Sequence, residues 1–138
     1  MIPAPVSNFL QNYFDKIFVI TIERAIDRQS EVTKQLEGLP FEFFYGVDKK
    51  TLDWNTINEE KVYDDTRARQ LNRYGKGMIM GHIACALSHG KLYEYILGNG
   101  YKRALIFEDD VVPISETLSQ LPVVVNELPA DWEMVYFG

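Results

Sequence analysis

Four short apolar runs alternate with longer segments of helical character, and this alternation restricts the fold of the chain more than any other feature. The runs are rich in β-branched and aromatic residues, as buried strands are: Lys16–Ile22, Phe41–Val47, Ala104–Phe107 and Glu133–Gly138. Strands separated by helices are typical of a mostly parallel sheet, so we predict an α/β, Rossmann-like fold. Sheets usually continue or are covered beyond such a final strand, so we expect this architecture to be incomplete.

Helices are predicted between these strands. The apolar residues of Ala25–Leu39 fall within roughly a 140° arc at 100° per residue, as on a surface helix. Gly77–Leu97 is apolar on nearly every side, which predicts a buried helix. Pro122 is expected to divide the last helical region into Ser115–Leu121, capped by its serine, and Val123–Leu128.

Length and composition describe one ordinary domain. The chain has 138 residues, of which 46% are apolar and 25% charged, an average globular balance. We expect residues 1–15 to form an N-terminal arm or short helix and residues 16–138 to form the domain. Residues 48–76 are polar and charged, which predicts a long excursion with one or two short helices, either a functional loop or an ordinary solvated surface.

Charge and cysteine content limit the partners and the compartment. The formal net charge of −6 argues against nucleic acid and means that an anionic ligand would need a bound cation or a local basic cluster. Cys85 is the single cysteine, which excludes an internal disulfide and fits a reducing compartment. No run approaches the roughly 18 apolar residues of a membrane helix, and we predict no signal peptide, so a cytoplasmic location is the default expectation.

Three consecutive acids, Glu108, Asp109 and Asp110, directly follow the third predicted strand. Ligands of open α/β sheets bind outside the carboxyl ends of the strands. Adjacent carboxylates repel one another, and a hard divalent cation with oxygen ligands would relieve that repulsion while also contacting phosphate oxygens. A solvated loop, or acids that cap the next helix, is the alternative that these residues leave open.

The helical segment Met80–Tyr93 carries both histidines of the chain, and His82, Cys85 and His89 lie within roughly a 60° arc. His82 and His89 are separated by roughly 10.5 Å along a straight helix, too far to share one zinc ion unaided. We therefore predict buried, hydrogen-bonded histidines. Ser88 and His89 need partners in this apolar helix, either a backbone carbonyl or a ligand hydroxyl or phosphate.

Polar residues also follow the first two predicted strands, where nucleotide-binding turns usually lie. The segment after the first strand lacks the glycines of a G-x-G-x-x-G loop or a P-loop. Arg28 could pair with a phosphate or form a surface salt bridge. Asp48, at the end of the second strand, could accept from ribose hydroxyls or a base, or cap a turn.

Four blocks, taken in order, resemble glycosyltransferase family 25, which includes bacterial lipooligosaccharide galactosyltransferases and collagen galactosyltransferases. The blocks are FVITIERAIDR (Phe18–Arg28), FEFFYGVD (Phe41–Asp48), GHIACALSHGKLY (Gly81–Tyr93) and ALIFEDDVV (Ala104–Val112). The final DWEMVYFG is also similar to the family, so the resemblance spans roughly residues 16–138. It implies a GT-A fold, a Rossmann-like domain that binds a nucleotide-diphosphate sugar.

The resemblance also implies roles for individual residues. Asp110 would bind Mn²⁺ or Mg²⁺, while Glu108 and Asp109 would help to hold the metal or the donor ribose. Thr21, Arg28 and Asp48 would lie along the nucleotide, and Ser88 and His89 would lie beneath the donor pocket. UDP-galactose is the implied donor.

A complete enzyme of this family would transfer the sugar to a glycan acceptor such as cell-surface lipooligosaccharide, with the metal neutralising the diphosphate leaving group. The resemblance leaves open a peripheral association with the inner face of the membrane. His82 and Ala84 depart from the family, which usually has glutamate and glycine there, and this puts activity or donor choice in doubt. Family members continue well past this segment, and no residue here is assigned as the catalytic base.

Two other classes of function compete with this prediction. A response-regulator receiver would need a further acid after the first strand and a late lysine, and Glu23 is a poor candidate for that acid. A non-catalytic module would bind a nucleotide sugar or a partner without turnover. If the native chain ended at Gly138, that module would be favoured, and an exposed apolar sheet edge would predict a homodimer or a partner strand.

Overall fold

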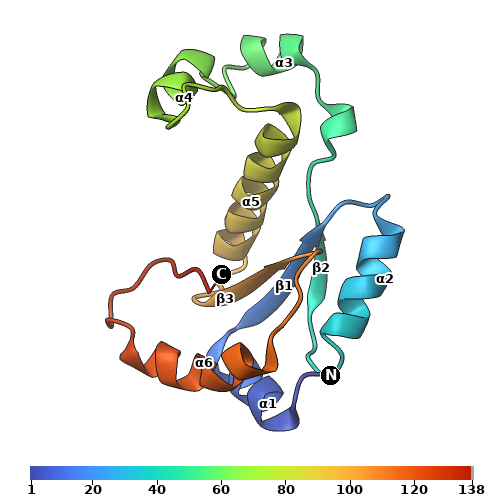
Figure 1. The fold of residues 1–138 in the computed structure, drawn as a ribbon, viewed down its shortest axis with the longest axis vertical. Helices are drawn as coiled ribbons and strands as arrows, with labels where there is room; N and C mark the ends of the chain where they lie inside the picture. The colour runs from blue at the N-terminus through green and yellow to red at the C-terminus, as the bar shows by residue number, and fades with distance from the viewer. Residues whose placement is uncertain (138) are drawn as a thin grey trace.

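The computed structural model describes residues 1–137, which form a three-stranded parallel sheet with helices on both faces (Figure 1). The strand order is β2 (Glu42–Tyr45), β1 (Lys16–Thr21), β3 (Ala104–Glu108). Ile20 of β1 pairs with Phe44 of β2 and with Glu108 of β3, so the carboxyl ends of the strands are level with one another. The first three predicted strands and the predicted α/β class are confirmed.

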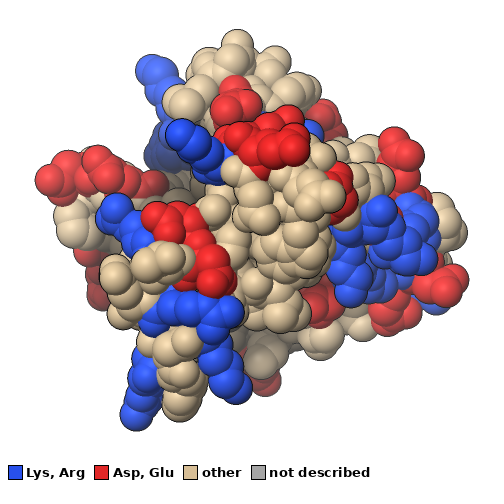
Figure 2. Space-filling model, turned by 90° about the horizontal axis from the view of Figure 1, so that it is seen from above, with Lys and Arg blue, Asp and Glu red and all other residues tan. Residues whose placement is uncertain are grey.

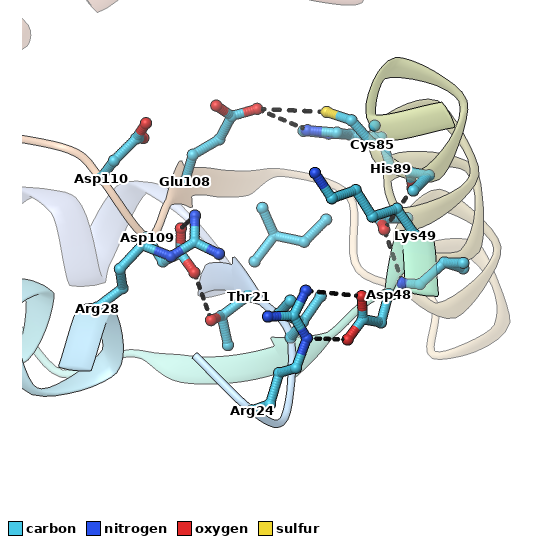
Figure 3. Close-up of a pocket in the computed structure, with 16 residues that line it drawn as sticks. Thr21, Arg24, Arg28, Asp48, Lys49, Cys85, His89, Glu108, Asp109 and Asp110 are labelled. Carbon is cyan, nitrogen blue, oxygen red and sulfur yellow. Dashed lines mark hydrogen bonds and ion pairs between the residues drawn. The ribbon is translucent and has the colours of Figure 1, made fainter. Parts of the chain in front are cut away.

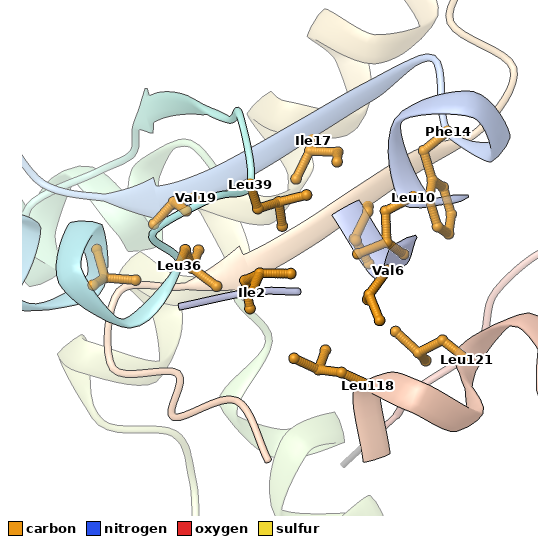
Figure 4. Close-up of a cluster of buried hydrophobic side chains, with 12 residues drawn as sticks. Ile2, Val6, Leu10, Phe14, Ile17, Val19, Leu36, Leu39, Leu118 and Leu121 are labelled. Atoms are coloured by element: carbon orange, nitrogen blue, oxygen red, sulfur yellow. The ribbon is translucent and has the colours of Figure 1, made fainter. Parts of the chain in front are cut away.

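The central strand β1 is buried on both faces, as parallel sheets covered by helices require. Its alternate residues Ile17 and Val19 face a large core built with three helices, α1 (Ala4–Tyr13), α2 (Ile26–Gln35) and α6 (Ser115–Glu127) (Figure 4). Phe18 and Ile20 face the other side, where they pack with Leu92 of the long helix α5 (Met80–Gly98).

Helix α1 belongs to the same core as the sheet. Pro5 lies in its first turn, where a proline is compatible with helix geometry because that amide has no helical partner. Val6 and Leu10 are buried together with Phe14, which ends the helix, and all three are members of the large core (Figure 4).

The prediction of two helices around Pro122 is wrong, because α6 runs unbroken through it. A proline inside a helix costs about 3 kcal/mol or more, but Leu118, Leu121 and Val125 are all buried, and their packing holds both halves in place. Ser115 does not cap this helix; Ile114 occupies the capping position without a side-chain hydrogen bond.

The predicted fourth strand is not formed by residues 133–137, and its last residue, Gly138, lies outside the described residues. Met134 is 56% exposed and Tyr136 is 85% exposed, so this segment has no buried face to fix it against β3. β3 is therefore an edge strand of the sheet that the described residues form.

The prediction that α5 is buried on every side is also wrong. Only Ile83, Ala84, Ser88 and Leu92 are buried, because a sheet of three strands covers one face of a 19-residue helix. Cys85 is exposed, and His82 is also exposed, against the expectation of a buried histidine.

The polar excursion forms short helices, as predicted. They are the 3₁₀ turn η1 (Lys49–Thr51), α3 (Trp54–Glu59) and α4 (Asp65–Leu71), and the last two lie near the N-terminal end of α5 (Figure 1). No helix of the described chain combines the length and apolarity needed to cross a membrane.

Candidate functional site

A cavity of about 370 Å³ opens where the three strands end, with α5 forming one wall (Figure 3). Its volume lies within the usual range of ligand sites, and its place matches the general rule for open α/β sheets. Every candidate residue from the sequence lines this cavity: Thr21, Arg28, Asp48, Ser88, His89, Glu108, Asp109 and Asp110. The strand ends therefore bring together residues that are up to 89 positions apart in the sequence.

The middle acid of the triplet, Asp109, is a buried structural residue of the cavity floor. The Thr21 hydroxyl donates to Asp109 Oδ2 at 2.5 Å, and Arg28 Nη1 lies 3.0 Å from Asp109 Oδ1. Both carboxylate oxygens are therefore engaged inside the protein. The ion pair predicted for Arg28 as an alternative to phosphate binding is thus present, although half of the arginine side chain remains exposed to the cavity.

The two outer acids, Glu108 and Asp110, both point to the side opposite the Asp109 carboxylate (Figure 3). Asp110 is exposed and has no hydrogen bond or ion pair within the described chain. Glu108 is the last residue of β3, and its Oε1 lies 3.1 Å from His89 Nε2 of α5. The carboxylates of Glu108 and Asp110 could therefore serve as oxygen ligands for a hard cation in the cavity.

Basic side chains line the part of the cavity near the end of β2. Arg24 forms an ion pair with Asp48, with a second hydrogen bond of 3.0 Å from Arg24 Nη2 to Asp48 Oδ1. This pair and the Lys50 backbone amide lower the pKa of Asp48 from 3.8 to about 2. Lys49 also lines the cavity and makes no ion pair within residues 1–137. The cavity thus holds three basic side chains, of which Arg24 and Arg28 are paired with aspartates and Lys49 is not paired within residues 1–137.

Ser88 fixes α5 against the end of β2. Its hydroxyl donates to the Ala84 carbonyl at 2.7 Å and accepts from the Val47 amide at 2.8 Å. The predicted backbone carbonyl partner is confirmed. The contact also explains Gly46, because a Cβ there would lie 2.6 Å from Ser88 Cβ.

Cys85 and His89 lie one turn apart on α5 and both approach Glu108 (Figure 3). Partial desolvation and the Glu108 carboxylate raise the pKa of the Cys85 thiol, so the thiol stays protonated at neutral pH and is a poor nucleophile. His82 is exposed and does not line the cavity.

The surface around the strand ends carries both signs of charge. The face shown in Figure 2 has acidic and basic side chains in separate groups and no continuous basic surface of the kind that nucleic acids bind.

Comparison with known protein families matches residues 14–135 to Glycosyltransferase family 25 (LPS biosynthesis protein). This chain belongs to glycosyltransferase family 25. The resemblance carried by the four sequence blocks is therefore confirmed. No solved structure matches this member of the family.

Relatives of this family 25 chain come from animals. The human protein "Inactive glycosyltransferase 25 family member 3" is 28% identical over 130 residues, which are 91% of this chain and 22% of that protein. Mouse "Procollagen galactosyltransferase 2" is 27% identical over 136 residues, 91% of this chain and 21% of that protein. A "Glycosyltransferase 25 family member" from Anopheles gambiae is 30% identical over 131 residues, 88% of this chain and 21% of that protein. The chain thus spans about a fifth of the length of these relatives.

Arg24, Lys49 and Cys85 are the charged or thiol-bearing cavity residues that the sequence did not assign. Arg24 lies shortly after the end of β1 and Lys49 shortly after the end of β2. Their positions after the strand ends could have identified both as cavity residues. The signal for Cys85 was its spacing of four residues from His89, which places both side chains on one face of a helix.

Proposed function

We propose that this chain is the donor-binding part of a metal-dependent glycosyltransferase that moves a sugar from a UDP-sugar to a glycan. Galactose is the proposed sugar, since the mouse relative is named a galactosyltransferase. A cell-surface glycan such as lipooligosaccharide is the proposed acceptor, in keeping with the family description as an LPS biosynthesis protein. The proposed location is the cytoplasm, at the membrane face where such a glycan is anchored.

The charge arrangement of the cavity carries this proposal. Arg28 and Lys49 line the cavity together with Glu108 and Asp110, with Arg28 on the side of Asp110 and Lys49 on the side of α5 (Figure 3). A nucleoside diphosphate fits this pattern, because basic side chains pair with some phosphate oxygens while a cation held by carboxylates neutralises the others. Neither the basic side chains alone nor a carboxylate-bound cation alone would neutralise the charge of a nucleoside diphosphate.

The residues present fit the divalent cation that the family implies. Asp110 is exposed and unpaired within the described chain, and Glu108 has one oxygen directed at α5 and a second without a hydrogen bond there. Carboxylate oxygens are the preferred ligands of Mg²⁺ and Mn²⁺. When bound, such an ion supplies charge stabilisation for the diphosphate leaving group.

The protein's own groups position the donor around that ion. Arg28 and Lys49 would contact the diphosphate, and Asp48 would lie near the ribose or base at the end of β2. Ser88 and His89 would form the wall beneath the sugar. Thr21 acts by holding Asp109, which in turn orients Arg28.

A second candidate is a non-catalytic module that binds a nucleotide sugar without turnover. The human relative named as inactive favours this alternative. The two candidates share the donor site and differ in turnover.

Calorimetry of UDP binding with and without Mn²⁺ tests the donor site. We expect binding that requires Mn²⁺ and is lost in Asp110→Ala, while Asp131→Ala, which removes an exposed acid outside the cavity, leaves it unchanged. Absence of UDP binding under both conditions would refute the donor site. Sugar release from UDP-galactose then separates an active transferase from a non-catalytic module.

A further inference from the structure

One group of three metal-ligating side chains converges among residues 1–137, and it shares only Glu108 with the consecutive acids that first suggested a metal. Cys85, His89 and Glu108 each offer one ligand atom, and these atoms all lie within 4.8 Å of one another. Glu108 Oε1 is 3.1 Å from His89 Nε2 and 3.9 Å from Cys85 Sγ. Figure 3 shows both α5 side chains directed at this single carboxylate.

The spacing of these atoms is close to that of a zinc centre. With Zn–S bonds of about 2.3 Å and Zn–N or Zn–O bonds of about 2.0–2.1 Å, tetrahedral geometry places ligand atoms about 3.3–3.6 Å apart. The two separations from Glu108 Oε1 depart from these values by less than about half an ångström, within reach of small side-chain rotations. The ligand atoms of Cys85 and His89 lie within 4.8 Å of each other. A pair of ligands four residues apart on one helix face is also a recurrent way to hold zinc.

The types of ligand select the class of metal. A thiolate and an imidazole favour zinc-class transition metals over Mg²⁺ and Mn²⁺, which prefer oxygen. His82 and His89 cannot share an ion, as their helical spacing indicates, and the exposed position of His82 agrees. Cys85 lies one turn from His89 on α5, so it can act as the second helical ligand where His82 cannot.

The surroundings favour a cation and leave room for it. Asp110 contributes a second negative charge near Cys85, in addition to Glu108. Cys85 and Glu108 are exposed and His89 is half-buried, so an ion reaches all three from the cavity without rearrangement of the backbone. Three protein ligands leave a fourth position open to water or a ligand atom, as in catalytic rather than structural zinc sites.

We propose that Cys85, His89 and Glu108 form a binding site for Zn²⁺ or a related transition metal on the α5 wall of the cavity. Binding would displace the thiol proton of Cys85, so that a thiolate, a neutral imidazole and a carboxylate coordinate the ion. The site does not require the proposed donor to bind. Because it uses Glu108, Zn²⁺ bound there would compete with Mn²⁺ for one carboxylate of the proposed donor site.

Co²⁺ titration of the metal-free, reduced chain, without nucleotide, is the direct test. A thiolate ligand gives a sulfur-to-cobalt charge-transfer band in the near ultraviolet, and four-coordinate geometry gives intense d–d bands in the visible. We expect both bands with one equivalent of Co²⁺ and their loss when Zn²⁺ displaces the cobalt. Absence of the charge-transfer band would overturn the proposal.

Variants assign the ligands. Cys85→Ser should abolish the charge-transfer band, and Cys85→Ser, His89→Ala and Glu108→Gln should each weaken Zn²⁺ binding at least about tenfold, since even outer-shell partners of metal ligands contribute about 10- to 100-fold. His82→Ala removes the other histidine of α5 and should change neither result. Retention of the band in Cys85→Ser, or its loss in His82→Ala, would overturn the assignment.

Folding and donor binding are checked separately. Circular dichroism of each variant excludes unfolding as the cause of lost metal binding, and Cys85 is exposed, so its serine variant should fold. UDP binding in Mn²⁺ is measured on His82→Ala, where we expect it to persist, because His82 does not line the cavity. A chain that binds Co²⁺ but not UDP would retain the zinc-class site and refute the donor site, and the converse result would do the opposite.

Discussion

The Thr21 hydroxyl donates a 2.5 Å hydrogen bond to Asp109 Oδ2, which joins the end of β1 to the residue that follows β3. The two residues are 88 positions apart in the sequence, and both are buried. Arg28 engages the second oxygen of the same carboxylate. The middle acid of the triplet therefore holds the floor of the cavity together, whereas its neighbours remain available to a ligand.

Removal of this carboxylate should destabilise the fold. We expect Asp109→Ala to lower the free energy of unfolding by about 2–3 kcal/mol, because hydrogen bonds to buried charged groups contribute about 1.5–3 kcal/mol. Asp110→Ala removes the adjacent exposed acid and should change stability by no more than about 0.5 kcal/mol. Urea denaturation measures both variants. Equal losses of stability in the two would contradict the structural role of Asp109.

Close packing between β2 and α5 predicts a second stability difference. An added Cβ at Gly46 would lie 2.6 Å from Ser88 Cβ, so Gly46→Ala should destabilise the protein by about 1–3 kcal/mol through overpacking. Gly90 on α5 has open space around it, and Gly90→Ala should stabilise the helix by about 0.5–1 kcal/mol. Thermal unfolding compares the variants. A neutral Gly46→Ala would show that Ser88 is not held against β2 as described.

The ion pair between Arg24 and Asp48 predicts an acid-dependent effect. The pKa of Asp48 falls to about 2 in the folded state, below its usual 3.8, so its contribution to stability is present above about pH 4 and is lost as pH falls through about 2. Arg24→Ala should move the Asp48 pKa back toward 3.8. NMR titration of the Asp48 carboxyl carbon measures this shift. An unchanged midpoint in the variant would show that Arg24 does not cause it.

Lys49 tests whether the basic side chains near the end of β2 contact the donor. We expect Lys49→Ala to weaken Mn²⁺-dependent UDP binding about tenfold, because a charge-assisted contact to a phosphate contributes roughly 1.5 kcal/mol. Lys50→Ala is the matched control, since Lys50 is adjacent in sequence but does not line the cavity. Calorimetry at constant ionic strength compares the two. Similar losses in both variants would indicate a general charge effect instead of a specific contact.

Much of this arrangement follows from local sequence. β1, β2 and β3 are short apolar runs between turn residues. Because ligands of open α/β sheets bind outside the carboxyl ends of the strands, the sequence predicts the triplet and Asp48 at one edge of the sheet, and both line the same cavity. These predictions succeed because burial in a parallel sheet depends on the composition of a few consecutive residues.

The failures depend on contacts that no short segment encodes. The continuity of α6 through Pro122 results from packing on both sides of the proline, and the exposure of α5 results from the small width of the sheet. The triplet looks like three equivalent acids in sequence, yet Asp109 differs from its neighbours because Thr21 and Arg28 reach it from β1 and α2.

Sequence and structure give different expectations for the effect of His82 on donor binding. Its presence in place of the family's usual glutamate suggested a damaged donor site, but its side chain is exposed and does not line the cavity. We therefore expect His82→Glu to leave Mn²⁺-dependent UDP affinity within about twofold, as for surface substitutions that change free energies by no more than about 0.5 kcal/mol. Lys49→Ala, measured alongside, shows that the assay responds to a lost contact. A tenfold or larger gain in His82→Glu would mean that the glutamate reaches the donor, and that this chain carries a weakened site.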